Sequence, residues 1–416
     1  MLKFFANFIC GFIIGRNNRR LVREKILTTN KILYHYYQAI KVILLFFLKT
    51  FFHSRSKRVL IVEPNPYHGE IIPGFVKYFK DLGYKVSCFL RKELESENVF
   101  VKCPSDFLNF VSYTDQDTIK TLLNFPFFVN REFDIIFVSS SAFWDTKNYI
   151  GSFVDFFNFK PQERENSFFV EHNPRDFLAK YKEIKLFEQK RLFSLGGFLG
   201  IPMLNPHYFG EVAITSKSSY KTRFIVVGAV NADYKNHKLL IDTVNLLVKK
   251  GITNFEVIII GSGNLFIPHD LQDYITFYGR LNFKKMFSYM EKADYYLPLL
   301  DITNQKHHKY LGSTCTGSRQ LILGFLKPCI IDETFGEIYG FNNENSIIYK
   351  NNDLQNAMEY AILLNNSDYN QKQSKLHDLQ KEIYSKSLLN LKSSIHMLKT
   401  GGGDVKKNII HFWHKA

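Results

Sequence analysis

The chain has 416 residues, of which 45% are hydrophobic and 22% are charged, and this composition excludes an intrinsically disordered protein. Such a length exceeds one ordinary core and predicts two domains with additions. The formal charge of +15 favours an anionic partner: a nucleic acid, an acidic lipid surface or a phosphorylated substrate. The five cysteines are odd in number and lack Cys-x-x-Cys spacing, which indicates a reducing compartment with neither a disulfide framework nor a zinc site.

Residues 1–27 combine an apolar stretch with a basic cluster that contains Arg16, Arg19, Arg20, Arg23 and Lys25. The charge follows the apolar part and no small-residue cleavage site appears, which argues against a signal peptide. We expect a helix that lies in the headgroup region of an anionic membrane. The alternative is a helix packed on the body of the protein.

Residues 32–52 form the most apolar window of the chain, with a core at Val42–Leu48. Lys41 and Lys49 interrupt this window, and its fully apolar core is too short to cross a bilayer. An interfacial or core-packed helix is therefore favoured over a transmembrane helix. We interpret His53–Lys57 as a basic hinge before the first domain. Residues 1–56 are therefore expected to form a helical extension that precedes this domain.

The first α/β unit begins at residue 57 and is expected to end near residue 215. A buried strand at Arg58–Val62 precedes the loop Glu63–Glu70, and a helix and a second strand follow. Two more buried strands end in Ser139–Ser141 and in Glu171–Pro174. Since the carboxyl ends of parallel strands share one edge of a sheet, we expect these loops to line the same region.

A second unit, expected at residues 216–350, repeats the pattern of strand, glycine loop and helix. Such alternation predicts a parallel sheet that is covered on both faces. In this architecture ligands bind at the carboxyl ends of strands, where glycine admits the backbone and helix amino termini attract anions. The loops at these ends carry groups suited to a diphosphate, namely Lys235, His237, Arg280, Ser318 and Arg319.

Helices are expected at 351–399, crossing back to the first domain, and a flexible tail at 400–416, where Thr400–Asp404 is rich in glycine. The predicted fold class is therefore α/β, with two Rossmann-like domains that face a cleft and an amino-terminal helical extension that associates with a membrane.

The order of short motifs in the second unit resembles that of a known enzyme family. The motifs are Val227-Gly228, Lys235-Asn236, Ile260–Gly263, Tyr278–Leu281, Ala293-Asp294, Gly317-Ser318 and Phe325–Pro328. Together they resemble the carboxyl half of bacterial glycosyltransferases of the GT-B type, and most of all family 4. That family usually carries two glutamates before its final proline motif, and Ser313 and Leu321 occupy those places here. The resemblance therefore implies neither the identity of the donor nor that transfer retains the configuration of the anomeric carbon.

The resemblance implies that the second domain holds a nucleotide-sugar donor, with Lys235 as the best-supported residue because its spacing from Gly228 matches the family. A solvated surface charge is the alternative for each cation. Positive side chains and backbone amides would neutralise the diphosphate, so no metal and no cofactor are expected beyond the nucleotide sugar itself. The expected donor and phosphate residues are Gly228, Lys235, Gly261, Gly263, Arg280, Thr316, Gly317, Ser318 and Arg319.

In the same family the loop after the first strand contacts the acceptor, which makes His68 and Glu70 the candidate catalytic residues. His68 would accept the proton of the acceptor hydroxyl and Glu70 would orient it, if transfer inverts the anomeric centre. If transfer retains configuration, both would only bind the acceptor, and a further alternative is that His68 caps the following helix. Tyr67, Gly69 and His172 are expected to contact the acceptor or line the cleft; His172 could also bind the donor, and a satisfied structural histidine is the alternative for it.

Asp115-Gln116-Asp117 matches the short acidic motif that binds a metal in single-domain glycosyltransferases. It lies just before a helical pattern, where aspartates serve as caps and first-turn charges. We expect this capping role and no metal site.

The sequence thus predicts a glycosyltransferase of bacterial envelope glycan synthesis, such as lipopolysaccharide or capsule. It would be cytoplasmic and peripheral on the inner face of the cytoplasmic membrane, acting on a saccharide or a lipid-linked acceptor. A nucleotide-sugar epimerase of the same fold and a non-catalytic membrane-surface scaffold are the alternatives. Nucleic-acid binding is not expected, because the basic residues concentrate at the amino terminus and no known binding module is present.

Overall fold

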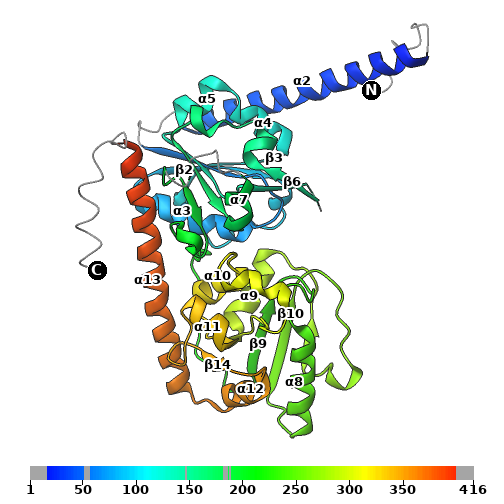
Figure 1. Cartoon of the computed structure of the whole chain (residues 1–416), viewed down its shortest axis with the longest axis vertical. Helices are drawn as coiled ribbons and strands as arrows, with labels where there is room; N and C mark the ends of the chain where they lie inside the picture. The colour runs from blue at the N-terminus through cyan, green and yellow to red at the C-terminus, as the bar shows by residue number, and fades with distance from the viewer. Residues whose placement is uncertain (1–15, 51–56, 146–147, 181–185, 187–188, 400–416) are drawn as a thin grey trace.

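The computed structural model describes residues 16–50, 57–145, 148–180, 186 and 189–399. Residues 1–15 of the expected membrane segment, most of the basic hinge and the expected tail at 400–416 lie outside the described residues. The described part contains two α/β units, each a parallel sheet with its own helices, which we call the first and the second layer. A long helix runs beside both of them, and another helix lies at the amino-terminal end (Figure 1).

The first layer is a six-stranded sheet in the order β3-β2-β1-β4-β7-β8, with every neighbouring pair parallel. All residues of β4 and β7 are buried, as expected for a parallel sheet with helices on both faces. The strands are β1 (Arg58–Glu63), β2 (Lys85–Arg91), β3 (Leu108–Thr114), β4 (Ile135–Val138), β7 (Ser167–Glu171) and β8 (Leu192–Ser194), and the pair β5 (Ala142–Asp145) and β6 (Asn148–Ser152) is antiparallel. The helices are α3 (Ile72–Asp81), α4 (Gln116–Leu123), α5 (Pro126–Glu132), α6 (Phe153–Phe157) and α7 (Pro174–Lys180), and the short 3₁₀ turn η1 covers Gly69–Ile71.

The second layer contains a four-stranded parallel sheet in the order β11-β10-β9-β12. A parallel bridge from Tyr296 to Cys329 leads on to the pair β13-β14. The strands are β9 (Thr222–Val227), β10 (Phe255–Ile260), β11 (Ile275–Phe277), β12 (Tyr295–Tyr296), β13 (Ile330–Asp332) and β14 (Ile347–Tyr349). The helices are α8 (His237–Lys249), α9 (Phe283–Lys292), α10 (Gly317–Phe325), α11 (Glu333–Tyr339), α12 (Leu354–Leu363) and α13 (Asn366–Lys399), and the 3₁₀ turn η7 covers Gln305–Leu311.

The strand order reverses between β1 and β4 in the first sheet and between β9 and β12 in the second. Both sheets thus follow the doubly wound Rossmann pattern, and the predicted α/β class with two Rossmann-like domains is confirmed. Open sheets of this kind bind ligands in the crevice beyond the carboxyl ends of the strands at which the order reverses. These two points are therefore the places to look for chemistry.

Helix α13 contacts both layers. Tyr384 stacks on Tyr78 of α3, with ring centroids 4.7 Å apart, and donates a 2.6 Å hydrogen bond to Asp81. On the other side, the amine of Lys372 donates to the carbonyl oxygen of Ser346, 3.1 Å away. The helix therefore braces the two layers against each other (Figure 1).

Helix α2 (Arg16–Thr50) is one continuous helix of 35 residues, so the two amino-terminal segments expected from sequence join within it. It lies across the end of the molecule that is farthest from the second sheet (Figure 1). Its side chain Phe46 is fully buried against Phe110 and Phe128 of the first layer. Among the described residues, Leu27–Thr50 is the one helical stretch long and apolar enough to span a bilayer, and 17% of its most apolar window is buried.

Candidate functional site

Glycine loops meet at the carboxyl end of the second sheet. Gly228 has a φ of +132°, which L side chains rarely adopt, and a Cβ atom on Gly261 would lie 1.7 Å from the carbonyl oxygen of Gly228. Gly263 has a φ of +126°, and a Cβ there would lie 2.7 Å from the carbonyl oxygen of Val230. The loops after β9 and β10 therefore touch backbone to backbone, which requires glycine at these positions.

Lys235 lies beside these loops and is only 4% exposed. Its amine donates to the carbonyl oxygen of Pro298 at 2.9 Å and to the hydroxyl of Ser318 at 3.1 Å. Burial lowers the pKa of Lys235 to about 7, and no described carboxylate opposes that loss of hydration. A buried amine whose partners are neutral is suited to bind an incoming anion.

The amino terminus of α10 supplies the second half of this site. Thr316 caps the helix by accepting from the backbone N–H of Ser318 at 3.3 Å, and the Ser318 hydroxyl also pairs with the hydroxyl of Tyr296 at 3.1 Å. A Cβ on Gly317 would meet open space, so the amino terminus of α10 is open at this residue, whereas Ser318 after it is buried. The structure thus gathers most of the predicted donor residues, namely Gly228, Lys235, Gly261, Gly263, Thr316, Gly317 and Ser318.

Two predicted phosphate residues are engaged elsewhere. The Arg319 guanidinium is buried over the ring of Tyr339 in α11, 5.5 Å from its centroid, and this packing does not favour a contact with phosphate. Arg280 forms a 2.7 Å ion pair with Glu97, which belongs to the first layer. Arg280 would therefore have to leave the Glu97 carboxylate in order to bind a phosphate.

A buried carboxylate marks the point at which the first sheet reverses its strand order. Glu63, the last residue of β1, accepts hydrogen bonds of 2.8 Å from the hydroxyls of Ser139 and Ser140 and one of 2.9 Å from the backbone N–H of Asn65. Burial raises the pKa of Glu63 to about 7, against the effect of these hydrogen bonds and of the charge on His68. Sequence reasoning gave Glu63 no role, although its position at the end of a buried strand was visible.

His68 lies next to this carboxylate, in the left-handed region with a φ of +64°. Its side chain makes no capping hydrogen bond, so the alternative that His68 caps the following helix is wrong. The Nδ1 atom lies 3.7 Å from Oε1 of Glu70, and the ring meets the ring of His172 edge-on with centroids 4.7 Å apart. A strained residue that contacts two ionisable groups is typical of a functional position.

The charges around His68 set its protonation. Burial opposes the charged form of His68, but its pairing with Glu70 and the charge of Glu63 raise its pKa overall. Burial, together with the charge of His68, lowers the pKa of His172 to about 3, so that ring stays neutral. The cluster therefore contains one basic imidazole that is about half exposed (49%), beside one that is neutral.

The loops of the two layers approach each other at this cluster. A Cβ on Gly69 would lie 3.2 Å from the ring of Phe283, and the backbone N–H of Phe283 donates to the carbonyl oxygen of Glu97 at 3.1 Å. The charge of Arg280 also contributes to lowering the pKa of Glu70. His68 and Glu70 thus face the second layer, and Tyr67 beside them is 37% exposed.

The places at which family 4 carries its glutamates are occupied differently here. Ser313 donates its hydroxyl to the carbonyl oxygen of Lys309, and Leu321 is buried in the core. Sequence reasoning missed Asp301, which follows β12 and accepts a 2.7 Å hydrogen bond from the side-chain amide of Asn236, next to Lys235. This contact joins the loop after β9, which carries Lys235, to the segment after β12, across the point where the strand order reverses.

Asp115 caps α4 and Asp117 lies in the first turn of that helix, the two roles expected for these aspartates. Asp115 accepts from the backbone N–H of Thr118 at 2.9 Å and pairs with His35 of α2 at 3.1 Å, while Asp117 forms a 2.7 Å ion pair with Lys31. These contacts of Lys31 and His35 with the motif dock α2 on the first layer.

No protein-family model matches this chain, and no curated protein shows significant similarity to it. Solved structures match at the level of shape. A glycosyltransferase from Rickettsia africae is 12% identical over 83% of this chain and 98% of its own, with a TM-score of 0.48. HepE from Anabaena, solved with UDP and glucose, is 11% identical over 81% and 99%, with a TM-score of 0.47. A Listeria monocytogenes protein assigned as a UDP-N-acetylglucosamine 2-epimerase is 10% identical over 76% of this chain and 90% of its own, with a TM-score of 0.40.

Proposed function

We propose that this chain is a glycosyltransferase that moves a sugar from a nucleotide-sugar donor to a saccharide or lipid-linked acceptor. The observation that carries the proposal is the buried amine of Lys235, which has no described carboxylate partner and lies beside the amino terminus of α10. The diphosphate of a bound nucleotide sugar would supply the negative charge that Lys235 lacks here.

The donor half would work by electrostatics. When the bond between the anomeric carbon and the phosphate oxygen breaks, negative charge grows on the leaving diphosphate. Lys235 and the backbone amide at Gly317 would stabilise that charge, joined by the Ser318 amide if the phosphate displaces its Thr316 cap, so we propose that no metal is required. Gly228 and Gly261 would let the diphosphate approach the backbone closely.

The acceptor half would work by proton transfer. His68 would accept the proton of the acceptor hydroxyl while the hydroxyl oxygen attacks the anomeric carbon, and the nucleoside diphosphate would leave. The nearby carboxylates Glu70 and Glu63 raise the pKa of His68 and would stabilise its imidazolium. This proposal corresponds to transfer with inversion.

The acceptor is proposed to belong to a bacterial envelope glycan, such as lipopolysaccharide or capsule, and to lie at the inner face of the cytoplasmic membrane. Support comes from the apolar and basic helix α2, which lies on the same domain as His68. A short apolar segment followed by Arg-x-x-Arg-Arg is also similar to the start of many lipopolysaccharide glycosyltransferases.

The test is an assay of purified full-length protein with a nucleotide sugar that it binds and a lipid-linked saccharide fraction from bacterial membranes. We expect release of the nucleoside diphosphate that depends on acceptor and is lost in His68→Ala. An isomerised free nucleotide sugar in the product would instead establish the epimerase alternative. Binding without turnover of any kind would favour the scaffold alternative.

A further inference from the structure

Helix α2 carries two apolar stripes on opposite sides. The inner stripe faces the first layer and is buried: His35, Ala39, Val42 and Phe46. The outer stripe has the same helical spacing but is exposed: Leu33 (59%), Tyr37 (65%), Ile40 (46%), Leu44 (58%) and Leu48 (74%). A helix that is apolar on both sides is typical of a buried or membrane-bound element. The inner stripe has its partner, and the outer stripe has none among the described residues.

Further large apolar side chains widen this exposed face. Ile32, Tyr36, Leu45 and Phe47 flank the outer stripe and are each at least 40% exposed. Soluble monomers rarely present a contiguous apolar patch of this kind unless it binds a partner. The face therefore needs an occupant.

The charge of the helix indicates which occupant fits. Lys31, Lys41 and Lys49 are exposed. At about 100° per residue, Lys41 lies roughly 60° from the middle of the outer stripe. Lys31 and Lys49 lie on the same side but nearer the inner stripe, and Lys31 pairs with Asp117 of the first layer. Glu24 is the single acidic residue in the sequence of α2. A second copy of the same face would bring like charges together, whereas an anionic lipid surface would pair with them.

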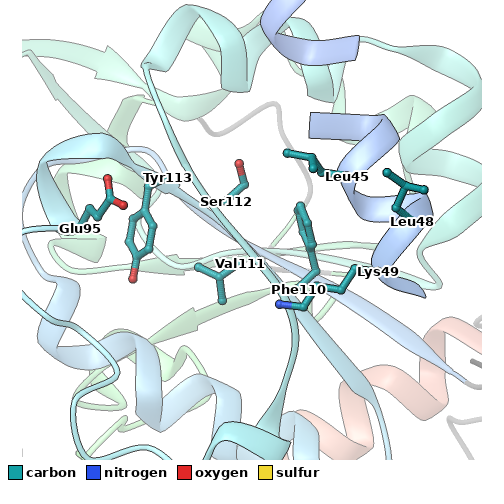
Figure 2. A pocket seen from close by; sticks show the side chains of 8 residues that line it. All are labelled: Leu45, Leu48, Lys49, Glu95, Phe110, Val111, Ser112 and Tyr113. Atoms are coloured by element: carbon teal, nitrogen blue, oxygen red, sulfur yellow. The ribbon is translucent and has the colours of Figure 1, made fainter. Parts of the chain in front are cut away.

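A groove extends the apolar face onto the body of the protein. It has a volume of about 540 Å³ and runs between the last turn of α2 and the edge strand β3 (Figure 2). Leu45 and Leu48 form its wall on α2 and Phe110 and Val111 its wall on β3, and its two charged lining residues are Lys49 and Glu95. A side chain such as Lys49, with an apolar stem and a charged tip, suits the boundary between acyl chains and headgroups.

We infer that the outer stripe of α2 lies in the headgroup region of an anionic bilayer and holds the first domain on the membrane. This inference rests on the proposed function, since it names the surface that brings the acceptor loop to a membrane-bound substrate. A transmembrane orientation would break the Lys31–Asp117 and His35–Asp115 pairs and expose Phe46. The helix therefore lies along the membrane surface and does not cross it.

The test is co-sedimentation of the full-length protein with vesicles of phosphatidylcholine alone or with 30% phosphatidylglycerol. The variant Leu44→Gln/Leu48→Gln removes apolar contact from the outer stripe. The matched control is Leu363→Gln/Leu389→Gln, which changes two leucines with nearly the same exposure, 75% and 59%, outside α2. Nucleotide-sugar binding in solution is measured on all three proteins.

We expect wild type and control to bind anionic vesicles, with weaker binding at high salt, and the α2 variant to bind at least about tenfold less. Equal binding by the α2 variant, or binding that survives alkaline extraction, would overturn the inference. A wild-type dimer in solution that becomes monomeric in the α2 variant would also overturn it, because a second copy would then occupy the face. Intact nucleotide-sugar binding in a variant that leaves the membrane separates this inference from the proposed function.

Discussion

The amine of Lys235 donates a 2.9 Å hydrogen bond to the carbonyl oxygen of Pro298, and this bond joins the loops that follow β9 and β12. In the first sheet, the Glu63 carboxylate joins the loops that follow β1 and β4 through Ser139 and Ser140. Each sheet thus places a buried ionisable group at the point where its strand order reverses. The proposed donor and acceptor sites are built on these two points.

Donor affinity should fall as the pH rises above about 7. Burial lowers the pKa of Lys235 to about 7, and a bound diphosphate would raise it again. The interaction is therefore fully present below pH 7 and weakens above it by up to about tenfold per pH unit. Titration calorimetry with a nucleotide sugar from pH 6 to 9 measures this, because the diphosphate keeps its charge over that range. Lys235→Arg should flatten the profile, and a flat wild-type profile would remove Lys235 from the phosphate site.

Replacing Glu70 by glutamine should shift the acid limb of the pH–rate profile to lower pH. Glu70 contributes the largest share of the rise in the pKa of His68, so an uncharged amide leaves a less basic imidazole. The measurement is kcat/KM for transfer against pH, with Glu211→Gln at an exposed position as the control. An unchanged acid limb would mean that His68 is not the base.

Freeing Arg280 from its ion pair should strengthen donor binding if Arg280 moves to the phosphates. The pair with Glu97 is partly exposed, with 53% of the arginine side chain accessible, and such pairs contribute only about 0.2–1 kcal/mol. Glu97→Gln should therefore tighten donor binding by no more than about fivefold at low salt, and Arg280→Ala should weaken it. If Arg280→Ala binds donor like wild type, the pair only holds the two layers together.

The docking of α2 should depend on its inner stripe. Phe46 is fully buried among Phe110, Phe128 and Phe133, so Phe46→Ala should reduce the free energy of unfolding by about 3–5 kcal/mol. Phe47→Ala, at a neighbouring position that is 40% exposed, should cost about 1 kcal/mol or less. Urea denaturation without lipid compares the two variants, and equal losses would mean that α2 does not dock as described.

The strands β1, β2, β4 and β7 of the first sheet, those of the second sheet and the glycine loops could be predicted from the sequence, because buried parallel strands are continuous apolar runs and their loops share an edge. Seven of the nine predicted donor residues come together for this reason. The edge strands β3 and β8 were not predicted, since β3 is mostly only half-buried and β8 has three residues. The Arg319 side chain could not be placed, since the period of a helix fixes its face but not what α11 puts beside it.

Contacts between segments that are distant in the sequence could not be predicted either. The pairing of Arg280 with Glu97 depends on how the two layers meet, and the pairing of Asp115 with His35 depends on where α2 docks. Glu63 was overlooked because a carboxylate at the end of a strand becomes noticeable only when the hydroxyls of Ser139 and Ser140 are seen around it. The sequence shows which groups lie at the edge of each sheet, but not which of them meet.

The most direct test of the central claim is a thermal-shift screen against UDP, GDP, ADP and CMP sugars without metal, on wild type, Lys235→Met and the matched control Lys238→Met. Lys238 is an exposed residue three positions from Lys235. We predict that one class of nucleotide sugar raises the Tm of wild type and of the control but leaves Lys235→Met unshifted. An equal shift in Lys235→Met, or no shift with any nucleotide sugar, would contradict the account.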